Sequence, residues 1–409
     1  MELRPILSAM RRNKVGAIVI AVQMAVTLAI LCNALFIIEQ RLSASRRPSG
    51  VDEANLFAIV NQWVGEPPDL AARLKTDLAA LRAIPNVVDA YATNSYPLSD
   101  GGSTEGVSTK PDVTDSPVST AEYMADTHGL DTLGVRLIAG RNFTPDEVID
   151  KAGFNDLASP RALIITRALA EKLFPGQSAV GKTLYGPERK GGGTTIVGVI
   201  DRLQVPWSGV GLWGSKFFYS SMIVPFNYMS SYSQYLVRAK PGHRSEVMLA
   251  ARKTLLQINR GRVLEKVQPL TDARTEAYKD DRALAVMLGV VCAALVLVTG
   301  FGIVGLTSYW VSQRRRQIGI RRALGATRHA IVRYFQTENL LIAGAGSAAG
   351  VGLAVALNLW MVGSFEMERL HFGYAVIGAV LVLLLGQISV LWPALRASAV
   401  PPALATRNA

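Results

Sequence analysis

One stretch of this chain matches the sequence pattern of a phosphate-binding loop. Gly176 to Thr183 reads GQSAVGKT, which fits G-x-x-x-x-G-K-[ST]. Such a loop needs a strand before it and a helix after it, because backbone N–H groups and the helix N-terminus must converge on the anion. Here residues 167–174 have a helical pattern, and Leu184 to Pro187 would end any following helix. We therefore expect no nucleotide site at Lys182.

The other residues that could do chemistry do not group into a site. The four histidines, at 128, 243, 329 and 371, lack the spacing of metal ligands, and no Ser, His and acid arrangement can be assembled. The only cysteines, Cys32 and Cys292, lie within long apolar runs, so we interpret them as small packing residues. We expect no catalytic residue, no metal site and no cofactor bound by this chain, and we do not predict an enzyme.

Four uncharged apolar runs must organise the fold. In a chain of 409 residues with 50% hydrophobic content, these runs contain no Asp, Glu, Lys or Arg, and each exceeds the ~20 residues that cross a bilayer. They are Val15 to Ile38, Ala283 to Val311, Leu340 to Val362 and Phe372 to Leu395. The first is longer than the roughly 7 to 15 apolar residues of a cleavable signal, so we predict a retained anchor.

The net charge of +12 follows the membrane topology that these runs predict. Thirteen basic and two acidic residues fall in 1–14, 312–339 and 396–409, whereas residues 39–282 carry 29 basic and 27 acidic residues. Basic residues concentrate on the cytoplasmic side of membrane proteins, so both termini are predicted to be cytoplasmic. A nucleic-acid partner is not needed to explain the charge.

The predicted division of the chain follows from the spans and the charge. It is a cytoplasmic N-terminus at 1–14, spans at 15–38, 283–311, 340–362 and 372–395, a periplasmic domain at 39–282, a cytoplasmic coupling segment at 312–339, a short periplasmic loop at 363–371 and a cytoplasmic tail at 396–409.

The long segment between the first two spans has a mixed α and β pattern. Two strand, helix, strand units flank it, with strands at 56–60, 87–88, 235–237 and 263–267 and helices whose inward residues are Leu70, Leu74, Leu78, Leu81 and Ile84, and Met248, Ala251, Leu255 and Ile258. Turn-rich sequence between the units predicts a second subdomain, with a helix start at Thr144 to Glu147 and a strand at 194–200. The fold class is thus a polytopic α-helical membrane protein with four transmembrane helices and a large mixed α/β extracytoplasmic domain of two subdomains.

The segment after the second span carries a specific family resemblance. Gln313 to Thr327 reads QRRRQIGIRRALGAT, which resembles the E-R-x-x-E-I-G-I-R-R-A-L-G-A-T signature of FtsX-like permeases. Gly140 to Asp146, Ala168 to Gly176 and Ile196 to Ile200 resemble segments of the MacB-type periplasmic core domain. Pro393 to Leu404 is similar to the short cytoplasmic ending of the same family.

The resemblance to the MacB/FtsX-like ABC transporter permeases implies a dimeric permease whose coupling segment docks on cytoplasmic ATPase subunits. ATP and Mg would belong to a separate ATPase dimer, because the N-terminal ATPase of MacB is not in this sequence. The implied docking residues are Gln317, Ile318, Gly319, Ile320, Arg321, Arg322, Ala323, Leu324, Gly325, Ala326 and Thr327. Gln313 and Gln317 depart from the family's frequent Glu, so any ion pair with an ATPase at those positions would be lost.

The family also implies further partners and an efflux function. These are a second or paralogous permease, a periplasmic adaptor, an outer-membrane channel and the lipid of a bacterial inner membrane, for export of a drug, peptide or other small product. Lipoprotein extraction and control of a cell-wall hydrolase are alternatives within the class. A secondary transporter or a membrane sensor without an ATPase is the third class, although uncharged spans offer no ion relay.

Two features keep their simpler explanations open. Residues 312–338 can form one helix near the membrane with Ile320, Leu324, Ile331 and Phe335 on its apolar face, but a basic loop at lipid headgroups would have the same composition. Gly346 and Gly350 have the spacing of a close helix contact, either within the chain or with another copy.

Overall fold

The computed structural model describes residues 14–65, 69–111, 117–152, 160–186, 192–208, 217–365 and 369–399. Most of the predicted N-terminal segment, the tail beyond 399, and parts of the turn-rich sequence and of the 363–371 loop lie outside these ranges. The chain divides into two compact units. We call Met1–Ser43 with Asp281–Ala409 the helical unit and Ala44–Asp280 the α/β unit.

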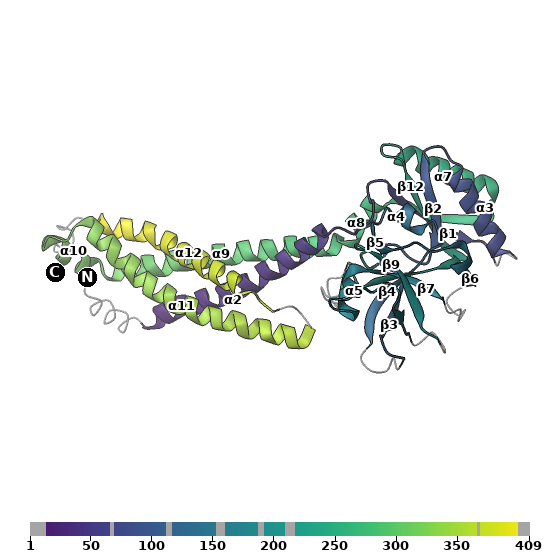
Figure 1. The fold of residues 1–409 in the computed structure, drawn as a ribbon. Helices are drawn as coiled ribbons and strands as arrows, with labels where there is room; N and C mark the ends of the chain where they lie inside the picture. Colours follow the sequence, from purple (N-terminus) through teal and green to yellow (C-terminus); the bar gives the residue numbers. More distant parts are fainter. Residues whose placement is uncertain are drawn as a thin grey trace. The chain divides into compact units, whose positions relative to one another are not determined.

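Four long helices build the helical unit and lie side by side (Figure 1). They are α2 (Lys14–Arg46), α9 (Lys279–Gln313), α11 (Arg328–Phe365) and α12 (Phe372–Ser398). Each is long and apolar enough to cross a membrane. Each contains one of the predicted spans and extends beyond it, which confirms a polytopic membrane protein with four transmembrane helices.

Helix α2 lies at the centre of this packing. A Cβ atom added at Gly346 would lie 2.7 Å from the carbonyl oxygen of Ala21, and one at Gly350 would lie 2.9 Å from that of Ala25. These glycines therefore let α11 approach the backbone of α2 closely. The small-residue face that the sequence left open meets the chain's own bundle.

Polar side chains also join the helices of the bundle. The hydroxyls of Thr27 and Thr299 lie 2.7 Å apart between α2 and α9, and the amide of Asn33 donates to the carbonyl of Ala354 on α11 at 3.2 Å. All three side chains are buried. Such bonds satisfy polar groups that would otherwise face hydrocarbon.

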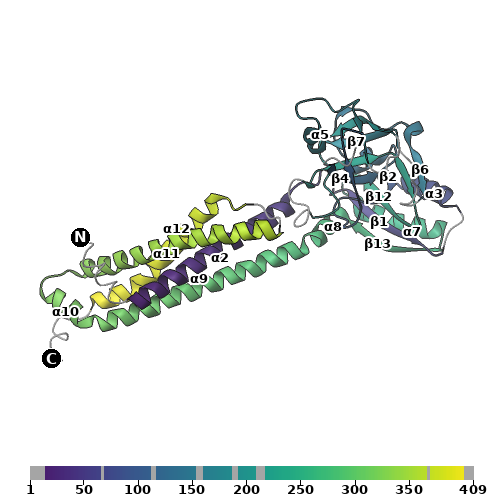
Figure 2. The same ribbon diagram turned by 90° about the horizontal axis from the view of Figure 1, so that it is seen from below.

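The α/β unit contains the two predicted strand, helix, strand units in one sheet. Strands β1 (Leu56–Trp63), β2 (Val87–Thr93), β12 (Tyr232–Ala239) and β13 (Arg262–Pro269) run in the order β13-β1-β12-β2, with antiparallel neighbours. This is the split β-α-β arrangement. Helices α3 (Leu70–Arg82) and α7 (Arg244–Ile258) pack against each other and against this sheet (Figure 2).

Alternate residues of β1 serve two cores. Phe57 and Ile59 pack with Leu78 beneath the two helices, while Leu56 and Ala58 pack into the core on the opposite face. The predicted inward face of α7 is largely confirmed, because Ala251 and Leu255 are buried and Met248 is partly buried against the same core. Ile258 was wrongly included, since it is 40% exposed, and Val247 is buried in addition.

The second subdomain is inserted between β2 and β12 and is built on a seven-stranded sheet, β3-β4-β10-β7-β9-β5 with β8 paired to β9. Its strands are β3 (Ser103–Val107), β4 (Val118–Met124), β5 (Leu137–Gly140), β6 (Ile149–Ala152), β7 (Ala162–Thr166), β8 (Thr183–Leu184), β9 (Thr194–Ile200), β10 (Ser221–Val224) and β11 (Phe226–Met229), of which β6 and β11 form a separate pair. The shorter helices of the unit are α4 (Gly129–Leu133), α5 (Arg167–Leu173) and α8 (Leu270–Ala277), and the predicted helix start at Thr144 is one 3-10 turn, η1 (Pro145–Glu147).

The phosphate-loop match has the wrong structural context. It follows helix α5 and runs into the short strand β8, so the element after the loop is a strand and not a helix. The Lys182 ammonium lies 4.6 Å from the centre of the Phe174 ring and contacts the side chain of Gln177. The loop therefore connects a helix to a strand, the reverse of the order that binds phosphate.

Candidate functional site

The predicted coupling segment forms a helix, a sharp turn and the start of a second helix. Helix α10 (Arg315–Ala323) is separate from α11, which begins at Arg328 and continues through its apolar span. The prediction of one helix over 312–338 is therefore wrong. Of the eleven predicted docking residues, seven lie on α10, and Leu324, Gly325, Ala326 and Thr327 form the turn.

The turn follows from its residue types. Gly325 has a φ of +99°, a conformation that glycine adopts without strain. The N–H of Gly325 donates to Arg322 O at 3.1 Å, and the N–H of Ala326 donates to Arg321 O at 3.0 Å, which is the Schellman pattern that ends a helix. Thr327 then accepts the N–H of Ala330 at 3.2 Å and caps α11.

The inner face of α10 is fixed to the helical unit. Ile318 is 6% exposed and belongs to the same buried cluster as Ile331 and Phe335. Arg314, directly before α10, donates to both carboxylate oxygens of Glu338 on α11, at 2.9 and 3.1 Å. Since Ile318 and its neighbour Gly319 are buried, they support the helix from within.

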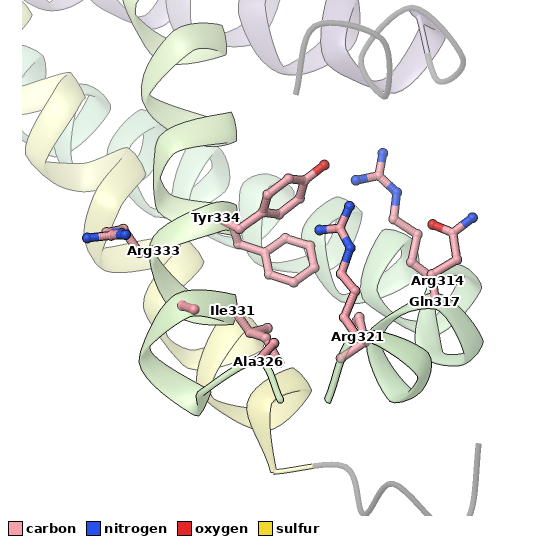
Figure 3. A pocket seen from close by; sticks show the side chains of 10 residues that line it. Arg314, Gln317, Arg321, Ala326, Ile331, Arg333 and Tyr334 are labelled. Atoms are coloured by element: carbon pink, nitrogen blue, oxygen red, sulfur yellow. The ribbon is translucent and has the colours of Figure 1, made fainter. Parts of the chain in front are cut away.

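A small cavity lies between α10 and the first turns of α11. Its volume is about 170 Å³, and its lining includes Ile318, Arg321, Ile331, Tyr334 and Phe335. The Arg321 guanidinium lies 5.0 Å from the centre of the Tyr334 ring, within reach of a cation–π interaction. Figure 3 shows the Tyr334 and Arg321 side chains on facing sides of this space.

The outer face of α10 presents apolar side chains among arginines. Ile320 on the helix is 45% exposed and Leu324, in the turn directly after it, is 83% exposed, and Arg321 and Arg322 lie between them in the sequence. The predicted apolar face that joined these residues to Ile331 and Phe335 does not exist, because the latter two are buried at 6% and 4%. Exposed apolar residues surrounded by cations are typical of a surface that binds a protein partner.

Glu338 and Arg314 are the residues that the sequence analysis did not assign. Glu338 is only 4% exposed, and it is the sole acidic residue between Asp281 and Glu366. The sequence did contain a signal for this pair. Glu338 is an isolated carboxylate at the edge of an apolar run, several arginines precede it, and a buried carboxylate needs a charged partner. The ion pair is the charged anchor of α10.

Several charged groups of the α/β unit form ion pairs with structural roles. Arg262 and Asp77 form a bidentate pair at 2.6 and 2.8 Å with each side chain 1% exposed. Arg141 and Glu147 form a second bidentate pair at 2.6 and 2.8 Å, and its hydrogen bonds lower the pKa of Glu147 from 4.5 to about 2. Among the described residues, no group of three His, Cys, Asp or Glu side chains could hold a metal ion.

Comparison with protein-family models gives two matches that together cover most of the chain. Residues 15–254 match the MacB-like periplasmic core domain, and residues 289–402 match the FtsX-like permease C-terminal domain. The first match alone spans more than half of the chain.

Similar proteins carry related names. The uncharacterized ABC transporter permease YknZ of Bacillus subtilis is 26% identical over 283 residues, which are 67% of this chain and 66% of that protein. The macrolide export ATP-binding/permease protein MacB of Neisseria meningitidis is 24% identical over 296 residues, 71% of this chain and 42% of that protein. The pyoverdine export ATP-binding/permease protein PvdT of Pseudomonas syringae is 35% identical over 135 residues, 33% of this chain and 20% of that protein. This chain thus covers less than two thirds of the length of each relative.

Two solved structures are similar over about half of the chain. The extracellular domain of YknZ is 17% identical, with a TM-score of 0.33, covering 51% of this chain and 100% of that domain. The periplasmic region of MacB from Actinobacillus actinomycetemcomitans is 12% identical, with a TM-score of 0.35, covering 57% of this chain and 97% of that region.

Proposed function

Because the chain belongs to the family of MacB-like and FtsX-like ABC transporter permeases, we propose that it is the membrane subunit of a machine in which a separate ATPase moves the α/β unit. ATP and Mg bind to the ATPase dimer, and this subunit performs no catalysis. The observation that carries the proposal is the exposed surface of α10 and of the turn after it, where Leu324 is 83% exposed beside arginines while Ile318 on the inner face of the helix is buried.

The arrangement of α10 suits the transmission of force. Its inner face contacts the helical unit through the buried Ile318 and through the Arg314–Glu338 ion pair. A force applied to its outer face can therefore be transmitted to α11 while α10 stays folded. An interface with apolar residues at its centre and charges at its rim is typical of protein–protein contacts. Gln317 contributes an amide at this site, so the ATPase contact does not depend on a carboxylate there.

The proposal assigns sides and partners to the chain. The protein spans the inner membrane of a bacterium with both termini and α10 in the cytoplasm and the α/β unit outside. A second copy or a paralogous permease completes the pair, and a periplasmic adaptor and an outer-membrane channel receive the exported product. We favour export of a small product over lipoprotein extraction or hydrolase control because two of the similar proteins are named for export.

Affinity purification from the native host tests the docking proposal. Leu324→Asp would bury an unpaired charge at the interface, which costs about 3–5 kcal/mol and should reduce the recovery of the ATPase at least tenfold. Leu249→Asp is the matched control, because Leu249 is 73% exposed on α7 of the α/β unit. An ATPase that accompanies Leu324→Asp in full amount, or that is absent from the wild type, would refute the docking site.

Cysteine labelling on intact cells tests the orientation. The native Cys32 and Cys292 are buried, so an introduced thiol at an exposed position gives the signal. A membrane-impermeant maleimide should label Leu249→Cys and spare His329→Cys, because His329 lies on the exposed first turn of α11. The reverse pattern would show that the sides are inverted.

A further inference from the structure

The cavity between α10 and α11 is lined by apolar side chains at its base and by arginines at its opening. Ile318, Ile331 and Phe335 are buried beneath it, and Arg314, Gln317, Arg321, Arg333 and Tyr334 also line it. Figure 3 shows the guanidinium groups of Arg314 and Arg321 and the hydroxyl of Tyr334 pointing toward the same side, whereas Arg333 points away. Three groups that donate hydrogen bonds to anions therefore meet at one opening.

The protein balances the charge at this opening only in part. Arg314 forms an ion pair with Glu338, and the Glu338 carboxylate also attracts Arg321, although within the described residues no carboxylate forms an ion pair with Arg321. Two guanidinium groups therefore share one carboxylate. Arg321 stacks on the Tyr334 ring, which orients the guanidinium group. Its N–H bonds lie in the guanidinium plane, so stacking does not prevent them from donating hydrogen bonds. One anion with at least two oxygen acceptors would complement Arg321 and the Tyr334 hydroxyl.

The depth of the opening along the helices indicates where such an anion comes from. Tyr334 lies six residues before the apolar run that starts at Leu340, which is about 9 Å along an α-helix. Arg314 lies three residues after the run that ends at Val311, which is about 4.5 Å. The headgroup layer is about 5–8 Å thick on each side of the hydrocarbon, so Arg314 lies within the layer and Tyr334 lies at its outer edge.

We infer that the pocket between α10 and α11 binds the headgroup phosphate of an anionic phospholipid from the adjoining leaflet. The phosphate oxygens accept hydrogen bonds from Arg321 and the Tyr334 hydroxyl, and the glycerol backbone covers the apolar floor. Basic pockets at the cytoplasmic ends of membrane helices suit this ligand. The lipid would fill the space behind α10 and stiffen the helix, while the face that carries Leu324 stays exposed.

Native mass spectrometry of the full chain in detergent tests this site without an ATPase. The wild type should bind one phosphatidylglycerol at least about tenfold more tightly than phosphatidylcholine. Phosphatidylglycerol has no ammonium group that competes with Arg321 for the phosphate, whereas phosphatidylcholine has one. Arg321→Gln should reduce that preference at least about fivefold. Arg316→Gln removes the same charge from an exposed position of α10 outside the pocket and should leave the preference unchanged.

A second variant guards against misfolding. Tyr334→Phe keeps the ring beneath Arg321 and removes only the hydroxyl, so it should fold as the wild type does and lose about two- to threefold of the preference. An unchanged preference in both Arg321→Gln and Tyr334→Phe overturns the site, as does an equal loss in Arg316→Gln. Displacement of the lipid by millimolar inorganic phosphate would show that the pocket binds free anions instead. If the wild type showed no preference for phosphatidylglycerol, an acidic segment of a protein partner would be the remaining ligand. Either result refutes the lipid assignment.

Discussion

Replacing Glu338 by Gln should release helix α10 from α11. The carboxylate of Glu338 accepts two hydrogen bonds from Arg314, and the two side chains are 5% and 14% exposed. The substitution keeps the size of the side chain but leaves the Arg314 guanidinium without its counter-charge. Since opening of α10 lets the unpaired guanidinium reach water, the helix should open more often while the rest of the bundle stays folded.

The magnitude follows from the burial of the pair. Removing one partner of a buried ion pair costs about 3–5 kcal/mol. Arg314 keeps some contact with its surroundings at 14% exposure and can turn toward the headgroup layer, so we take about 2–3 kcal/mol for the local opening. At about 1.4 kcal/mol for each factor of ten, the open population rises about 30- to 150-fold.

Limited trypsin digestion of the full chain in detergent measures this population. Helix α10 contains Arg315, Arg316, Arg321 and Arg322 as cleavage sites. When opening is fast compared with cleavage, the cleavage rate tracks the open population, so Glu338→Gln should be cut in α10 about 30- to 150-fold faster. Cleavage at sites in the α/β unit should not change.

A double variant separates the lost anchor from the stranded charge. Arg314→Leu with Glu338→Leu leaves no unpaired charge, so its α10 should be cut within about fivefold of the wild-type rate. A Glu338→Gln rate within about threefold of wild type would refute the anchor. A double variant as sensitive as the single one would show that the stranded charge is not the cause.

Two further predictions concern stability. Gly350→Leu should lower the melting temperature of the purified chain through about 1–3 kcal/mol of overpacking, because an added Cβ lies 2.9 Å from the Ala25 oxygen. Gly352→Leu is the control and should leave the melting temperature unchanged, because a Cβ at Gly352 meets nothing within 4 Å. Equal shifts in the two variants would contradict the α2–α11 contact. The pKa of Glu147 is depressed from 4.5 to about 2, so its pair with Arg141 stabilises the fold above pH 4.5 and loses this effect as the pH falls toward 2. Glu147→Gln should therefore cost about 1 kcal/mol or less at pH 7, and melting curves should show the difference from wild type shrinking between pH 4.5 and 2, while a pH-independent difference would contradict the linkage.

The features that the sequence predicted well are those with a strong periodic or compositional signal. The uncharged runs identify α2, α9, α11 and α12, and the two strand, helix, strand patterns identify β1 to β2 and β12 to β13. The assignment of segments to the two sides of the membrane stays a prediction. The mixed sheet of the inserted subdomain was not predictable, because it pairs strands as distant as β4 and β10, and local pattern carries no information on such pairing.

The coupling segment shows why the remainder was missed. The apolar residues from Ile320 to Phe335 fit one helical face only if the helix continues through Gly325. Gly325 and Thr327 were the signals of a helix end and of a new helix start. The prediction treated the apolar spacing as continuous across these residues, and it therefore assigned residues of two different helices to one face. The Gly346 face could not be assigned from the sequence, since a helix neighbour and lipid present the same apolar surroundings.

Site-specific crosslinking tests the central claim, that the outer face of α10 contacts an ATPase. A photoreactive benzoylphenylalanine in place of Leu324 lies on the exposed face of the segment, and the same residue in place of Leu249, 73% exposed on α7, is the control. Irradiation of intact cells followed by mass spectrometry should identify an ABC-type ATPase joined to position 324 and not to position 249. Adducts at position 324 that contain lipid or other proteins but no ATPase would contradict the account.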